Sequence, residues 1–99
     1  MRLVITQLAE QDIESIGDYI ARDNPRRALS FIRELRSQCQ RISKTPQGYR
    51  LRDELGVGIR SCAYGNYVIF FEIETDALRI VRILHGARDI PAVLGVDTE

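Results

Sequence analysis

The triplet Asp23-Asn24-Pro25 is the feature that most constrains how this chain can fold. Asn24 can cap a helix with its side chain, and Pro25 suits the first helical position because its missing N–H needs no partner there. Apolar residues recur at three- and four-residue spacing on both sides of the triplet: Ala9, Ile13, Ile16 and Ile20, then Ala28, Ile32, Leu35, Cys39 and Ile42. The pattern predicts two amphipathic helices, from about Gln7 to Arg22 and from Pro25 onward, joined as an antiparallel αα-hairpin.

Short apolar runs on either side of this hairpin predict strands. The run from Leu3 to Ile5 is too short for a helix, and Thr6 after it can cap the first helix. Pro46 and Gly48 end the second helix, and a loop follows through about Gly56. Three strands are then predicted at Val57–Cys62, Tyr67–Glu74 and Leu78–His85. The connections between them are short, so we expect an antiparallel meander.

The order β-α-α-β-β-β predicts an α+β fold in which the hairpin packs on one face of a small, mostly antiparallel sheet. A chain of 99 residues supports one modest core, so we expect one domain over residues 1–99 with no deep pocket for a cofactor. The opposite sheet face is then left to solvent or a partner, because only the tail from Gly86 remains to cover it. Function is expected on a surface, a groove or an interface.

Charge and cysteine content narrow the class of protein. With 14 basic and 14 acidic residues the chain has no net field toward nucleic acid or membrane, so we expect neither a membrane contact nor sequence-specific nucleic-acid binding by the chain alone. The N-terminus lacks the long apolar region of a signal peptide, which indicates the cytoplasm. Cys39 and Cys62 are interpreted as small buried residues, and we expect no disulfide, metal or cofactor.

The last predicted strand carries charge among apolar residues. Strict alternation places Leu78, Ile80, Arg82 and Leu84 on one face, and Arg79, Val81, Ile83 and His85 on the other. The sequence does not determine which of these faces meets the helices. In either case an arginine lies between apolar neighbours, and such an arginine has an acidic partner or extends to an edge of the sheet.

Four residues are candidates for a binding surface: Arg60, Arg82, His85 and Arg88. His85 is the sole histidine, so a paired-imidazole mechanism is excluded, and a structural role is favoured over a general base. Arg88 follows a turn that Gly86 permits, and its side chain either binds a carboxylate or phosphate or pairs with Asp89. Together the three arginines predict a basic patch at one end of the sheet, suited to an anionic segment of a protein or nucleic acid.

Two other groups have simpler interpretations. The arginines of the second helix are spread around it and indicate a solvated face. Asp23, Glu34 and water can interact with their guanidinium groups. The strand aromatics include Phe70 and Phe71, of which at least one must point into the core.

Three long segments, AEQDIESIGDYIARDNPRRALSFIRELRSQC, RLRDELGVGIRSCAYGNYVIFFEI and RIVRILHGARDI, resemble the ParE branch of the RelE/ParE toxin superfamily. The most specific pieces are Tyr19–Pro25, Gly58–Ser61 and Leu84–Ile90. The resemblance implies the same β-α-α-β-β-β fold and a small cytoplasmic toxin of a plasmid-stabilisation type. It also implies neutralisation by direct binding of a cognate ParD-like antitoxin, and DNA gyrase as the target. Arg60, Arg82, His85 and Arg88 then become candidates for contact with the target or the antitoxin.

The related RelE branch cleaves messenger RNA in the ribosome, which gives an alternative function. Its site uses basic residues to stabilise the charge on phosphorus, together with a base for the 2′-OH. Here Gly56 and Gly58 stand where the lysines would align, Tyr67 replaces the strand arginine, and Leu94 lies near the tail tyrosine. Only Arg88 matches, so a gyrase-binding poison is favoured over an endoribonuclease. A partner-binding module without toxicity is a third hypothesis, and residues Val93–Glu99 are expected to order only against a partner.

Overall fold

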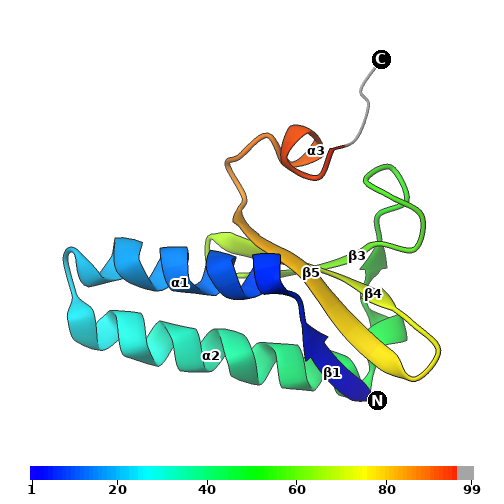
Figure 1. Cartoon of the computed structure of the whole chain (residues 1–99), viewed down its shortest axis with the longest axis horizontal. Helices are drawn as coiled ribbons and strands as arrows, with labels where there is room; N and C mark the ends of the chain where they lie inside the picture. The colour runs from blue at the N-terminus through cyan, green and yellow to red at the C-terminus, as the bar shows by residue number, and fades with distance from the viewer. Residues whose placement is uncertain (96–99) are drawn as a thin grey trace.

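In this protein a helical hairpin lies on one face of a five-stranded sheet (Figure 1). The computed structural model describes residues 1–95. The elements in chain order are β1 (Arg2–Ile5), α1 (Gln7–Ala21), α2 (Pro25–Lys44), the 3-10 turn η1 (Pro46–Gly48), β2 (Arg50–Leu51), β3 (Arg60–Tyr64), β4 (Tyr67–Ile73), β5 (Ala77–His85) and α3 (Ile90–Val93). The predicted α+β class and the β-α-α-β-β-β order of the main elements are therefore confirmed.

The sheet has the strand order β1-β5-β4-β3-β2. β5 pairs in parallel with β1 and antiparallel with β4, and the remaining neighbours are antiparallel. The register with β1 covers only the first half of β5, from Ala77 to Ile80. The first and last strands of the chain are thus neighbours, and the second half of β5 has a strand on one side only.

The main core lies between the hairpin and the sheet. Thr6 and Asn24 cap the two helices, as predicted, by accepting hydrogen bonds from the backbone N–H of Ala9 and Arg27. The apolar stripes of the helices then meet the strands in one buried cluster: Ala9, Ile13, Ile16, Phe31, Leu35, Cys39, Ile42, Cys62, Ile69, Phe71, Leu78, Ile80 and Ile83. Burial of each large side chain stabilises the fold by roughly 1.5–3 kcal/mol, so this cluster is the main source of stability.

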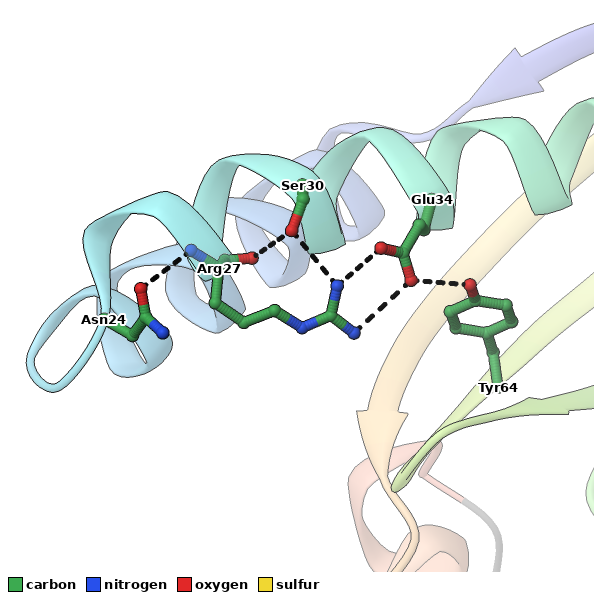
Figure 2. A network of polar contacts seen from close by, with 5 residues as sticks. All are labelled: Asn24, Arg27, Ser30, Glu34 and Tyr64. Atoms are coloured by element: carbon green, nitrogen blue, oxygen red, sulfur yellow. Dashed lines mark hydrogen bonds and ion pairs between the residues drawn. The ribbon is translucent and has the colours of Figure 1, made fainter.

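A polar network on α2 ties the hairpin to the sheet (Figure 2). Arg27 donates to Glu34, and the Tyr64 hydroxyl at the end of β3 donates to the same carboxylate over 2.8 Å. The hydrogen bonds from Arg27 and then Tyr64 lower the pKa of Glu34, and this carboxylate in turn raises the pKa of Tyr64. The arginines of α2 are thus partly paired, since Arg36 also contacts Glu10 over 2.8 Å.

The strand predicted to begin at Val57 begins instead at Arg60. Gly58 has a φ of +80°, its N–H donates to the Asp53 carboxylate, and Val57 is 95% exposed in the intervening turn. A left-handed residue interrupts an extended strand, which is why this prediction is wrong at its first residues. The short β2 was not predicted, because two residues carry no periodicity.

The tail covers part of the second face of the sheet, which the prediction left to solvent or a partner. Asp89 caps α3, and the tail folds back so that Ile90, Val93 and Leu94 pack against Phe70 and its neighbours. This cluster has three buried members: Leu55, Phe70 and Leu84. The expectation that Val93 onward needs a partner to order is wrong for Val93 and Leu94, and its remainder from residue 96 lies outside the described residues.

A bulge in β5 changes which side chains face the helices. Phe71 is paired with Ile80 and Phe70 with Arg82, so Val81 is an extra residue on β5. The predicted strict alternation is therefore wrong: Leu78, Ile80 and Ile83 all join the helix-side core, whereas Leu84 belongs to the opposite cluster. Phe70 and Phe71 are both buried, on opposite faces.

Cys39 and Cys62 are free and buried, as predicted. Burial raises the pKa of the Cys39 thiol to about 11, which leaves it protonated and unreactive at neutral pH. No helix within residues 1–95 is both long and apolar enough to cross a membrane.

Candidate functional site

A hollow of about 520 Å³ lies between α1 and the second half of β5. It is formed where β1 has ended and only side chains from α1 cover the edge of β5. Its lining residues come from α1, β4, β5 and the turn after β5: Gln11, Asp12, Ser15, Ile16, Tyr19, Tyr67, Arg82, Ile83, Leu84, His85 and Arg88. Three of the four candidate binding residues, Arg82, His85 and Arg88, are thus brought together.

Arg82 is held in an ion pair. Its Nε and Nη2 donate to the two carboxylate oxygens of Asp12, each over 2.8 Å, and the side chains are only 18% and 12% exposed. The hydrogen bonds to Asp12 raise the pKa of Arg82. Arg82 therefore has the acidic partner that was one of its two predicted alternatives, and its charge is already matched inside the hollow.

Side chains from the start of α1 also replace the missing strand along β5. The Asp12 carboxylate accepts the Ile83 N–H over 2.9 Å, and the Thr6 hydroxyl donates to the Val81 carbonyl over 3.1 Å. Both backbone groups point away from β4, where a continued β1 would have bound them. Asp12 and Thr6 thus satisfy the edge of β5 and fix its position against α1.

His85 and Tyr67 form the floor of the hollow nearest the turn. Their rings meet edge to face, with centroids 5.3 Å apart. The Ala87 N–H donates to His85 Nδ1 over 3.1 Å, so in the neutral ring the proton is assigned to Nε2, which is free to donate to a ligand. His85 is exposed, and this geometry suits a binding residue more than a general base.

Arg88 extends from the exposed turn that follows β5. Its N–H donates to the His85 carbonyl over 3.1 Å, and Gly86 donates to the Asn66 carbonyl, which fixes the turn without a left-handed glycine. Within residues 1–95 no carboxylate lies within ion-pair distance of its guanidinium, and Asp89 instead caps α3. Arg88 is the one unmatched guanidinium among the described lining residues of the hollow.

Arg60 does not belong to this group. Its Nη1 donates to the Tyr49 carbonyl over 2.8 Å, and its strand partner is Phe71, far along the strands from His85. The predicted basic patch of Arg60, Arg82 and Arg88 at one end of the sheet is therefore not formed.

Sequence reasoning missed the contribution of α1 to the hollow. Gln11, Ser15 and Tyr19 line it with polar groups, and Tyr19 is 65% exposed. A signal was present, because Tyr19 is a large aromatic residue that lies outside the buried stripe of α1. The pairing of Asp12 with Arg82 had no such signal, since the two are separated by 70 positions.

Of the positions aligned with the ribonuclease residues, only Tyr67 and Arg88 line the hollow. Gly56 and Gly58 lie in the loop before β3, and Leu94 packs in the apolar cluster on the second sheet face. Tyr67 lines the hollow with its ring against His85. Among residues 1–95 no group of three acidic, histidine or cysteine side chains could hold a metal ion.

Comparison with known proteins agrees with this architecture. The solved structure of a chromosomal ParDE toxin-antitoxin system from Pseudomonas aeruginosa shares the fold with a TM-score of 0.74, at 22% identity over 86% of this chain and 95% of that chain. The RelBE2 toxin-antitoxin complex from Mycobacterium tuberculosis gives a TM-score of 0.57, at 22% identity over 85% and 95% of the two chains.

Sequence comparison is more specific. The chain is 28% identical over 92 residues to Toxin ParE1 of Caulobacter vibrioides, an alignment that covers 92% of this chain and 95% of that protein. The model of the family described as ParE toxin of the type II toxin-antitoxin system parDE matches residues 3–90, which include α1, α2, all of the sheet except Arg2, and the turn that carries Arg88. This chain therefore belongs to the ParE toxin family of type II toxin-antitoxin systems.

Proposed function

We propose that this toxin acts by inhibiting DNA gyrase and that a cognate ParD-like antitoxin neutralises it by direct binding. Family membership supports the toxin role, and the hollow between α1 and β5 is the observation that supports a binding mechanism. Its partners are expected to be proteins, and we propose the cytoplasm as the place where the toxin acts.

The chemistry of the hollow favours an acidic or polar protein segment. Arg82 and Asp12 neutralise one another, which leaves the Arg88 guanidinium as the net charge of the lining. His85 Nε2, the Tyr19 hydroxyl and the Ser15 hydroxyl add hydrogen-bond donors around a partly apolar floor. Guanidinium and neighbouring donors bind a carboxylate well, so Arg88 and His85 are the residues we propose to contact a partner.

The RelE-type alternative receives less support. Cleavage of RNA needs a general base and cations placed around one phosphate. In the hollow, Arg82 is occupied by Asp12. Apart from Arg88, the positions aligned with the ribonuclease residues are glycine, tyrosine and leucine. One arginine and one histidine suit recognition better than the full set of catalytic roles.

Two assays run side by side test the proposal. The purified toxin is added to a gyrase supercoiling reaction and to ribosomes translating a defined messenger RNA. We expect loss of supercoiling with intact messenger RNA. Cleaved messenger RNA with normal gyrase activity would establish the ribonuclease alternative, and normal growth on expression without antitoxin would favour a module that has lost toxicity.

Charge reversal separates the target from the antitoxin. Arg88→Glu places an anion in the hollow, whereas Arg50→Glu, at an exposed position on β2, is a matched control. We expect Arg88→Glu to reduce gyrase inhibition at least about tenfold, since reversing a charge in a binding site turns attraction into repulsion. An unchanged antitoxin complex in the same variant would assign Arg88 to the target, and a lost complex would assign it to the antitoxin.

A further inference from the structure

The outward side of the α1–α2 hairpin has a second hollow, of about 410 Å³, which shares no lining residue with the first. Its apolar lining consists of Gly17, Ala21, Pro25, Ala28, Leu29 and Ile32. At Gly17 the two helices pack closely, because a Cβ at this position would lie 2.6 Å from Ile32 Cδ1. Small residues from both helices thus form a shallow groove along the seam between them.

Leu29 stands at the edge of this groove and is 60% exposed. It is among the most exposed large apolar residues of α1 and α2, with Leu8 and Tyr19, which lie on the other side of α1. A protruding leucine beside a groove of small residues is a knob beside a hole. Such a surface can be complementary to a copy of itself.

The charges in and beside the groove divide between the two helices: Glu14 and Asp18 line it, whereas Arg26 and Arg33 follow its lining residues Pro25 and Ile32 in the chain. Glu14 and Asp18 are exposed on α1, and Arg26 and Arg33 are exposed on α2. Within residues 1–95 none of these four side chains has an ion-pair partner, unlike Arg36 and Arg27 on the same hairpin. One helix therefore presents unmatched negative charge and the other unmatched positive charge.

The packing of the hairpin fixes which residues lie level with each other. Gly17 touches Ile32, and Glu10 pairs with Arg36. Because the helices run antiparallel, Glu14 lies about level with Arg33, and Asp18 about level with Leu29.

We propose that this face binds a second copy of the chain, as a symmetric dimer whose two-fold axis runs parallel to the helices. This axis places α1 of each copy against α2 of the other, so that Glu14 faces Arg33 and Leu29 enters the groove beside Gly17. The other in-plane axis would place acidic α1 against acidic α1. Two copies with no net charge approach without general repulsion, which favours association.

This inference does not depend on the proposed function, because no residue of the groove lines the hollow beside β5. The two proposals can therefore fail separately.

Sedimentation of the purified full-length chain, over micromolar to millimolar concentrations, tests the dimer. We expect a mass that rises from 11.3 kDa toward twice that value. Leu29→Asp is expected to weaken association at least about tenfold, since it puts a charge into an apolar contact. Leu8→Asp, at a leucine that is 54% exposed on α1, is the matched control and should leave association unchanged.

Charge swaps make the test specific for the axis. Glu14→Arg alone and Arg33→Glu alone should each abolish the dimer, because each homodimer then has like charges facing one another. An equimolar mixture of the two variants should regain the dimer mass, since both contacts become opposite-charge pairs. A wild-type chain that stays at the monomer mass, or a dimer that tolerates Leu29→Asp, would overturn the proposal, as would a mixture that remains monomeric.

Discussion

The two halves of β5 differ in what holds them. Ala77–Ile80 lies between β1 and β4 and contributes Leu78 and Ile80 to the core. Beyond the bulge at Val81, the strand has β4 on one side and only the side chains of Thr6 and Asp12 on the other. Where the neighbouring strand ends, an edge and the hollow that holds the proposed binding residues become available, while Ile83 and Leu84 of this half remain buried in the two clusters.

The largest expected loss of stability comes from a substitution in the first half of β5. Ile80→Ala removes a fully buried side chain from the core and should lower the free energy of unfolding by about 3 kcal/mol. Urea unfolding followed by circular dichroism measures this change. Val57→Ala, at an exposed position, should alter it by less than about 0.5 kcal/mol.

The next largest loss of stability is expected where α1 contacts the second half of β5. Asp12→Ala leaves the Arg82 charge and the Ile83 N–H without their partner, so we expect a loss of about 2 kcal/mol, reduced from that of a fully buried pair by the remaining exposure. Glu10→Ala, which breaks the exposed pair with Arg36, should cost no more than about 0.5 kcal/mol. Equal losses in the two variants would show that Asp12 has no special role.

A smaller effect tests the side-chain cover of the β5 edge. Thr6→Ala removes both a helix cap and the bond to the Val81 carbonyl, whereas Asn24→Ala removes only a cap. We expect losses of about 1.5 and 1 kcal/mol, since a cap contributes about 1 kcal/mol and one further hydrogen bond adds about half of that or more. Denaturant midpoints of the two variants provide the comparison, and a smaller loss for Thr6→Ala would contradict it.

The smallest expected effect on stability is that of a change at Arg88, in the turn after the second half of β5. Arg88→Glu changes an exposed side chain with no ion-pair partner among residues 1–95, so the unfolding free energy should move by less than about 0.5 kcal/mol. Gyrase inhibition should nevertheless fall, as proposed above. A large loss of stability in this variant would contradict the stated difference between the first half of β5 and the region that follows it.

Local signals explain how much of the fold could be predicted. Thr6 and the Asn24-Pro25 pair each mark a helix start within a few residues, and both helices begin where these signals place them. The bulge at Val81 could not be predicted in this way, because it depends on the pairing of β5 with β4. A single extra residue was enough to reassign Ile83 to the helix-side core.

The candidate site was predicted in part for the same reason. His85 and Arg88 lie close in sequence, at a turn, and were identified as candidates. Arg60 was grouped with them although the meander carries it away, and the α1 residues that line the hollow lie about 70 positions earlier in the chain. Contacts of that separation follow from the β1–β5 pairing and not from any local pattern.

The parallel pairing of β1 with β5 also determines when the sheet can form during translation. During translation, the first strand emerges early but must wait for its neighbour, which is encoded more than seventy codons later. The helices can form in the meantime, yet the edge that α1 covers does not exist until residues 77–85 have left the ribosome. The hollow between α1 and β5 can therefore form only after nearly all of residues 1–95 have been synthesised.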